Sequence, residues 1–251
     1  MLEALSSLFA PHSLVNLRDY TPLQLGLNAA GCLLWVVVYY VIVRDILRRR
    51  FVEMPFFIAC GNLAWEFVWS VPFSPNSGLL FAWLYRSAFV LDLFIFANLL
   101  RYGQKQVATP ELLRYWRLLC PLLVAAWAAL CYFFRTSGLD DAIGATSGYI
   151  LNLFISVLYF QLYFRVRDPR YFSPLVAWTR MLGTALITAS VWLMFPRNSF
   201  VQTLGLFCFL LDCLFIALLH AERGRPAAGA GAGAASVARS GTRSTSRVMS
   251  S

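Results

Sequence analysis

Charged residues are scarce in this sequence. Asp, Glu, Lys and Arg make up 13% of its 251 residues, about half of the roughly 25% found in soluble domains. Hydrophobic residues account for 59% and aromatic residues for 16%. These values exclude a water-soluble globular domain, because the surface of such a domain carries many more charged side chains.

Metal-ligating patterns are missing as well. The two histidines, His12 and His220, stand near the ends, and the six cysteines show no metal-ligand spacing. The adjacent aspartates Asp140 and Asp141 are followed by Ala-Ile-Gly, so the third carboxylate of a magnesium-binding Asp-Asp-x-x-Asp segment is absent. The single lysine, Lys105, falls in a loop, which excludes a retinal Schiff base. We therefore expect no metal and no cofactor.

Long hydrophobic runs are present instead. Seven runs of about twenty residues are each long enough to cross a hydrocarbon layer of about 30 Å as a helix. The sequence therefore predicts an all-α integral membrane protein, a seven-transmembrane-helix bundle. The spans are expected at residues 25–43, 55–71, 79–100, 118–134, 142–164, 174–194 and 200–219.

The basic residues are divided unevenly between the two sides of this bundle. Of the 21 Lys and Arg residues, sixteen follow the first, third and fifth spans or lie in the C-terminal tail, and three lie on the other side. Because cytoplasmic loops carry the excess of Lys and Arg, we expect the N-terminus outside, in a lumen or periplasm, and the C-terminus in the cytoplasm. This arrangement accounts for the net charge of +9 without a nucleic-acid partner.

The chain divides into three parts. Residues 1–24 form an N-terminal segment in which leucines at helical spacing suggest a helix lying along the membrane surface. Residues 25–220 form the transmembrane domain. Residues 221–251 are rich in Ala, Gly, Ser and Arg, a composition that buries no core, so we expect a disordered cytoplasmic tail.

Five charged side chains fall inside the hydrophobic runs, and each costs about 2.5–3.5 kcal/mol at the bilayer centre. They are Glu66, Arg86, Asp92, Arg180 and Asp212. At about 1.5 Å per residue, the three carboxyls lie at similar depths near the midplane. Two interpretations remain open: the acids pair with the two arginines to hold the bundle together, or some of them carry out chemistry.

Sequence context favours chemistry for Glu66 and Asp212. Asn62 and Trp69 share the helical face of Glu66, and no basic residue stands close to Asp212 in sequence. A carboxyl group buried in an apolar place is expected to stay protonated near neutral pH, as a general acid must be. Glu66 and Asp212 are therefore the candidate catalytic residues.

A polar and aromatic stripe along the fifth span extends this predicted site. Tyr149, Asn152, Ser156 and Tyr159 recur at helical spacing. Aromatic faces stabilise cations within about 6 Å of the ring centroid, so an acid among them suits reactions through carbocations, although such stripes also serve packing. We expect a cavity among the second, third, fifth and seventh spans. Its candidate substrate-binding residues are Asn62, Trp65, Trp69, Arg86, Asp92, Asn152 and Tyr159.

The segment Asn62-x-Ala64-Trp65-Glu66, an acidic residue in the last span (Leu211-Asp212) and the seven-span layout together resemble a known family. It is the small seven-span membrane terpene cyclases of meroterpenoid and indole-terpenoid biosynthesis, of the pyripyropene and paspaline cyclase type. The resemblance covers about residues 20–220, and its acid residues match Glu66 and Asp212.

The resemblance implies a metal-independent cyclase. Such an enzyme protonates a terminal epoxide or alkene of a linear prenyl chain, on a prenylated aromatic or indole precursor, and drives cyclisation through carbocations. Its partners would be the bilayer, this hydrophobic substrate, and a prenyltransferase and an epoxidase of the same pathway. The membrane would be the endoplasmic reticulum in a fungus or the plasma membrane in a bacterium.

A seven-span transporter is the main alternative. Its midplane carboxyls would bind protons or a polar solute. It predicts spans broken by Gly or Pro at the site, whereas the prolines here cluster at the span ends. A heptahelical receptor or assembly factor would need no protonatable midplane residue. The oligomeric state and the substrate are not indicated by the sequence.

Overall fold

The computed structural model describes residues 13–107 and 109–224. Each of the seven predicted spans is helical there. The long helices are α2 (Pro22–Arg49), α3 (Phe56–Ser70), α4 (Leu79–Tyr102), α6 (Trp116–Thr136), α7 (Ala145–Val166), α8 (Pro174–Met194) and α9 (Ser199–Gly224). Between them lie the short helices η1 (Gly103–Gln106), α5 (Pro110–Arg114) and η2 (Pro169–Tyr171). The described residues contain no strand, so the predicted all-α membrane fold is confirmed.

Local sequence signals explain where the helices begin. At the start of α2, Thr21 accepts a hydrogen bond from the backbone N–H of Gln24, whose side chain accepts one from the N–H of Thr21. This reciprocal pair satisfies two backbone donors that a helix start leaves free. Ser173 accepts a hydrogen bond from Val176 at the start of α8. Both helices have proline in their first turn, where its fixed φ suits a helix.

Six helices are long and apolar enough to cross a membrane, and α3 is the exception. Its 15 residues span about 22 Å at 1.5 Å per residue. The number of membrane crossings therefore stays a prediction, as does their orientation. Large hydrophobic side chains lie exposed on the outer faces of the helices, among them Leu118, Leu122 and Phe133, as expected for contact with lipid.

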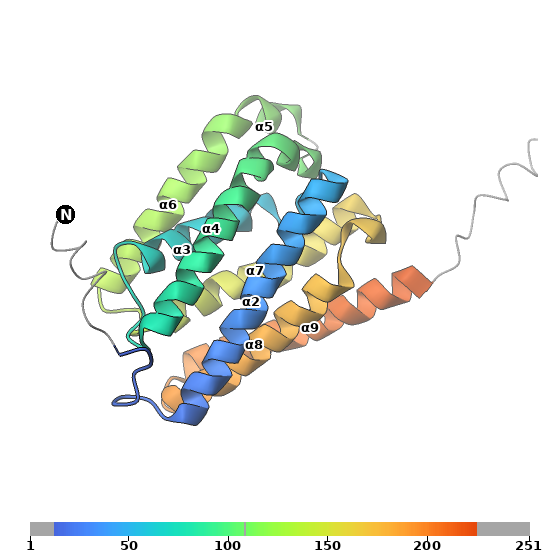
Figure 1. The fold of residues 1–251 in the computed structure, drawn as a ribbon. Coiled ribbons are helices and arrows are strands. Elements are labelled where there is room, and N and C mark those ends of the chain that lie inside the picture. Colours follow the sequence, from blue (N-terminus) through green and yellow to red (C-terminus); the bar gives the residue numbers. More distant parts are fainter. Residues whose placement is uncertain (1–12, 108, 225–251) are drawn as a thin grey trace, which may run out of the picture.

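The helices pack as a bundle with α3 and α7 on the inside. In Figure 1, α6, α4, α2, α8 and α9 follow one another across the front, and α3 and α7 lie behind them. α2 packs against α8 and α4, α3 packs against α4, α6 and α7, and α9 packs against α7 and α8. α9 continues to Gly224, past the predicted boundary at residue 220. The predicted surface helix in residues 1–12 and the tail from residue 225 lie outside the described residues.

Candidate active site

A cavity opens between five helices of the bundle. Its walls come from α2, α3, α4, α7 and α8 and from the loop before α7, and it encloses about 800 Å³ of space including its opening. The expected cavity among the second, third, fifth and seventh spans is therefore partly wrong. α2 and α8 contribute to the walls, and no lining residue comes from α9.

Glu66 is the acidic residue of this cavity. It lies in the middle of α3 and is 5% exposed. The Tyr39 hydroxyl on α2 lies 3.3 Å from Glu66 Oε1 and donates to it. Glu66 Oε2 is buried and has no hydrogen-bond partner among the described residues. One carboxyl oxygen is thus held by the protein and the other is left free.

Asn62 fixes the direction of the hydrogen bond between Tyr39 and Glu66. The Asn62 side-chain amide donates to the Tyr39 hydroxyl oxygen at 2.7 Å and to Asp92 Oδ2 at 2.6 Å. Since the Tyr39 oxygen accepts from Asn62, its proton is available for Glu66. Asp92 does not line the cavity; it orients Asn62 from behind. The expected pairing of Asp92 with an arginine is wrong, because an amide one helix away supplies its partner.

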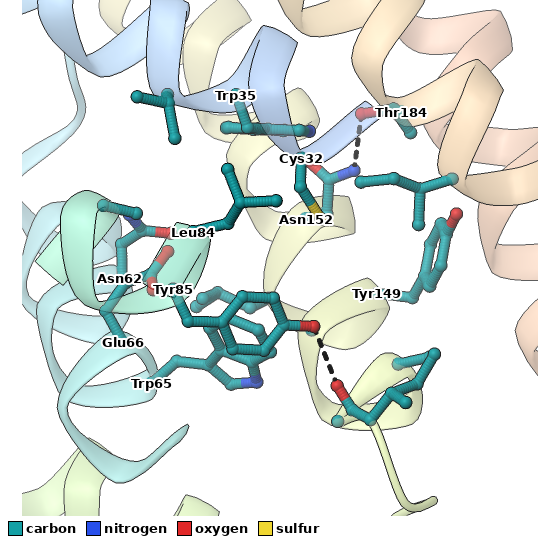
Figure 2. A pocket seen from close by; sticks show the side chains of 18 of the residues that line it. Cys32, Trp35, Asn62, Trp65, Glu66, Leu84, Tyr85, Tyr149, Asn152 and Thr184 are labelled. Carbon is teal, nitrogen blue, oxygen red and sulfur yellow. Dashed lines mark hydrogen bonds between the residues drawn. The ribbon is translucent and has the colours of Figure 1, made fainter. Parts of the chain in front are cut away.

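Aromatic rings stand beside Glu66. Trp65 and Tyr85 line the cavity with ring centroids 5.4 Å apart, and Figure 2 shows both rings next to Glu66. Trp35 of α2 lines it as well. Trp69, predicted to bind substrate, lies 6.3 Å from the Trp65 ring and is not a lining residue. One helical turn beyond Trp65, it packs against Gly144 instead.

The opposite side of the cavity carries amide and hydroxyl groups. Figure 2 shows Asn152, Thr184 and Tyr149 there, across from Glu66. The Asn152 amide donates to the Thr184 hydroxyl at 3.1 Å. Asn152 Oδ1 and the amide nitrogen of Asn28, another lining residue, are buried without a partner among the described residues. The structure therefore brings the predicted residues Asn62, Trp65, Glu66 and Asn152 to one cavity.

Asp212 belongs to a different cluster. Its Oδ1 accepts hydrogen bonds from Arg180 Nη2 and from the Ser156 hydroxyl, each at 2.8 Å, and it does not line the cavity. The expected meeting of three carboxyls is therefore wrong for Asp212, whereas Glu66 and Asp92 are joined through Tyr39 and Asn62. Similar depth does not bring residues together, because α9 turns Asp212 toward α7 and α8, whereas α3 turns Glu66 toward α2 and α4.

Two other predicted substrate-binding residues also lie elsewhere. Tyr159 packs its ring under Arg180, 4.0 Å from the guanidinium carbon, and donates to the Glu53 carbonyl at 2.5 Å. Arg86 donates to the Ser70 carbonyl at 3.5 Å and lies over the Trp83 ring. Neither lines the cavity, so their assignment to substrate binding is not supported.

One wall of the cavity was missed by the sequence reasoning. Asn28, Cys32, Trp35 and Tyr39 follow one face of α2 and all line the cavity. Their spacing of four, three and four residues is the signal that could have found them, because residues so spaced share a helical face. Residues 25–43 contain no charged side chain that would mark this face.

In the part of the chain that the structure describes, no three His, Cys, Asp or Glu side chains gather where they could hold a metal ion. The groups that line the cavity are one carboxyl group, four hydroxyls, one thiol, three amides and several aromatic faces.

Comparison with known proteins gives one result that bears on these residues. No curated protein and no solved structure matches the chain. The model of the Pyr4-like transmembrane terpene cyclases matches residues 13–196, a range that includes Glu66, its hydrogen-bond partner Tyr39 and every lining residue of the cavity. The chain therefore belongs to the Pyr4-like transmembrane terpene cyclases.

Proposed function

We propose that Glu66 starts cyclisation by protonating the terminal epoxide or alkene of a linear prenyl chain. One observation carries this proposal: Tyr39 donates to Glu66 Oε1, while Oε2 has no partner within the described part of the chain. In a neutral carboxylic acid the carbonyl oxygen is the stronger acceptor, so we assign Oε1 as the carbonyl oxygen. The acid proton therefore lies on Oε2, where a substrate can take it.

Proton transfer and ring closure then follow in balanced steps. With an epoxide, the proton moves from Oε2 to the epoxide oxygen, the bond from that oxygen to the tertiary carbon breaks, and a hydroxyl group and a carbocation form. The π electrons of the next double bond close a ring on the cation. Loss of a proton from the last cation to the Glu66 carboxylate regenerates the acid. Substrate and product are isomers.

The cavity walls suit such cations. Trp65, Tyr85 and Trp35 line the cavity, and an aromatic face attracts a cation within about 6 Å of its centroid. Tertiary carbocations react with water, so an apolar wall also protects them. Trp69 supports Trp65 from behind and is not assigned a contact with substrate.

We assign Asp212 to holding the bundle together. Its charge is matched by Arg180, and both side chains are buried outside the cavity. This assignment leaves Glu66 as the proton donor and keeps Asp212 out of the reaction path.

The substrate class is a prenylated aromatic or indole compound that enters from the bilayer. Asn152, which lies across from Glu66, and Asn28 supply further polar atoms to the cavity, which suits a chain with a polar head group. A prenyltransferase would supply this substrate and an epoxidase would activate its terminal double bond. We place the protein as a seven-span protein of the endoplasmic reticulum or plasma membrane with its N-terminus outside.

The Glu66→Gln variant tests the proposal. Purified protein in lipid vesicles is given a phenol bearing a farnesyl chain with a terminal epoxide, and separately the alkene, and products of unchanged mass are measured. We expect turnover to fall about 10²–10⁴-fold, the usual contribution of a general acid.

Glu53→Gln is the matched control, because Glu53 is equally buried but does not line the cavity; its turnover should stay near that of the wild type. Wild-type turnover in Glu66→Gln would exclude Glu66 as the donor. Uptake of solute into the vesicles without any turnover would contradict the cyclase and favour a transporter.

A further inference from the structure

The two aspartates of the loop before α7 both bind backbone N–H groups at the start of that helix, and Asp140 alone also binds the Ser147 hydroxyl. The Asp141 carboxylate accepts hydrogen bonds from the backbone N–H groups of Ile143, Ala145 and Thr146, at 3.0, 3.0 and 2.8 Å. These donors stand at the start of α7 and would otherwise lack a partner. Asp141 therefore caps the helix, and Asp140 Oδ1 adds to this cap by accepting from the backbone N–H groups of Asp141 and Ser147, each at 3.1 Å.

Asp140 turns both of its oxygens toward Ser147. Oδ1 accepts from the backbone N–H of Ser147 at 3.1 Å, and Oδ2 accepts from the Ser147 hydroxyl. The Ser147 oxygen in turn accepts from the indole N–H of Trp65 at 2.8 Å. Because Asp140 takes the hydroxyl proton, the lone pairs of the Ser147 oxygen are left for the indole. Asp140, Ser147 and Trp65 thus form a directed chain of hydrogen bonds that ends on a wall of the cavity.

The same loop also binds the neighbouring Tyr85 ring, and the first turns of α7 pack against Trp65. The Tyr85 hydroxyl donates to the Ile143 carbonyl at 3.0 Å, the lower dashed line in Figure 2. A Cβ atom added to Gly148 would lie 3.2 Å from Trp65 Cζ2, so the indole lies directly on the glycine backbone. Trp65 is therefore held at its N–H by Ser147 and packed against Gly148, one residue away from the acid Glu66.

We propose that Asp140 is a positioning residue of the cyclase, which acts through Ser147 to hold the Trp65 indole at a fixed tilt in the cavity wall. This inference rests on the proposed function. The attraction between a ring face and a cation depends on their distance and orientation, so the tilt of Trp65 selects among the carbocations that follow protonation. Asp140 therefore governs which products form, and Glu66 governs whether the reaction starts.

The hydrogen bonds from Asp140 through Ser147 to Trp65 should give a spectroscopic signature that a purely structural aspartate would lack. The Trp65 indole N–H bonds to a hydroxyl that is polarised by a carboxylate, which strengthens the bond. In Asp140→Asn the new amide group donates to the Ser147 oxygen and competes with the indole. In Ser147→Ala the acceptor is lost altogether.

The experiment combines nuclear magnetic resonance with product analysis. Protein with ¹⁵N-labelled tryptophan is prepared in detergent, and the Trp65 indole N–H resonance is identified by its loss in Trp65→Phe. We expect this resonance to move upfield in Asp140→Asn and in Ser147→Ala. With the farnesylated phenol epoxide as probe, the ratio of cyclised products should change about three- to thirtyfold, the range of a cation–π contact, while total turnover changes less.

Two further variants separate positioning from general damage. Ser190→Ala removes another buried serine hydroxyl, which does not line the cavity and donates to the Gln24 carbonyl at 2.7 Å. This variant should leave the resonance and the product ratio unchanged. In the Trp65→Phe background, Asp140→Asn should have no additional effect on the ratio. An equal effect with and without the indole, or an unmoved resonance in both Asp140→Asn and Ser147→Ala, would overturn the proposal.

Failure of this inference and failure of the proposed function give different results. If the wild type does not convert the probe, the proposed function fails, while the indole resonance still decides whether Asp140 acts on Trp65. If Glu66→Gln abolishes turnover but Asp140→Asn moves neither the resonance nor the ratio, the cyclase proposal stands and the positioning role is rejected.

Discussion

Arg180 and Asp212 form a buried ion pair, with 2.8 Å between Nη2 and Oδ1, at the interface where α8 and α9 meet α7. Their side chains are 1% and 0% exposed. Ser156 adds a hydrogen bond to the same carboxylate oxygen, and the Tyr159 ring covers the guanidinium. Two charges that are each costly in the bilayer thus neutralise each other between the consecutive helices α8 and α9.

Removing one member of this ion pair should lower the stability of the fold and should not change which products form. Asp212→Asn leaves the Arg180 charge buried and unpaired, which typically costs about 3–5 kcal/mol. We expect a lower midpoint of thermal unfolding in detergent. The double variant Asp212→Leu, Arg180→Met removes both charges and should recover most of the stability, with the product set of the wild type. Asp212→Asn protein that is as stable as wild type but makes no product would show that Asp212 takes part in the reaction.

Tyr39→Phe should slow the reaction without weakening substrate binding. The variant keeps the ring and loses the hydroxyl that donates to Glu66 Oε1, so the acid proton is no longer directed to Oε2. One hydrogen bond contributes about 1–1.5 kcal/mol, so kcat should fall about tenfold with KM nearly unchanged. Tyr159→Phe is the control, because it loses an equally buried hydroxyl outside the cavity. Equal rates in both variants would contradict the proton-directing role of Tyr39.

Two glycines allow the contact between Trp69 and the residue before α7 to be tested. Gly138 and Gly144 have φ values of +76° and +75°, so alanine is strained at both by about 1–2 kcal/mol. A Cβ atom at Gly138 meets open space, whereas one at Gly144 clashes with the Trp69 indole. Gly144→Ala should therefore lower the free energy of unfolding by about 1–3 kcal/mol more than Gly138→Ala, measured by denaturant unfolding. Equal losses in the free energy of unfolding would mean that Trp69 moves away from the new methyl group without an energetic cost.

The loop carboxyl Asp140 should make stability depend on pH. Burial raises its pKa above the ordinary value of 3.8, although the Ser147 hydrogen bonds oppose this shift. The charged groups beside it are Asp141 and Arg135, whose guanidinium donates to the Asp140 carbonyl, and the titratable side chains of Cys131 and Tyr85 lie nearby.

Because the folded protein binds the Asp140 proton more tightly than the unfolded chain does, its contribution to the free energy of unfolding is complete below pH 3.8 and declines as the pH rises through the raised pKa. The Trp65 indole resonance should titrate with a midpoint above 3.8, and this titration should vanish in Asp140→Asn. Asp168 is a control of opposite sign, since its exposed carboxyl has a pKa lowered by Arg170. A Trp65 titration that persists in Asp140→Asn would contradict the assignment.

The helices and part of the site could be predicted from the sequence. A run of about twenty apolar residues has few alternatives to a membrane helix, so all seven runs appear as helices. Asn62 and Glu66 are four residues apart and therefore share a face of α3 whatever surrounds it. The acid, its amide neighbour and the adjacent Trp65 follow from this local geometry.

Only the tertiary structure decided which helix faces meet. The rotation of each helix about its axis depends on packing against all its neighbours, and no local pattern encodes it. Asp92 and Asp212 have similar depth and similar sequence surroundings, yet one supports the acid through Asn62 and the other pairs with Arg180. The α2 wall of the cavity and the link from Asp140 to Trp65 depend likewise on contacts between distant segments. The sequence by itself determined the membrane helices and the placement of Asn62, Trp65 and Glu66 together on α3, and the packing of those helices determined which groups surround Glu66.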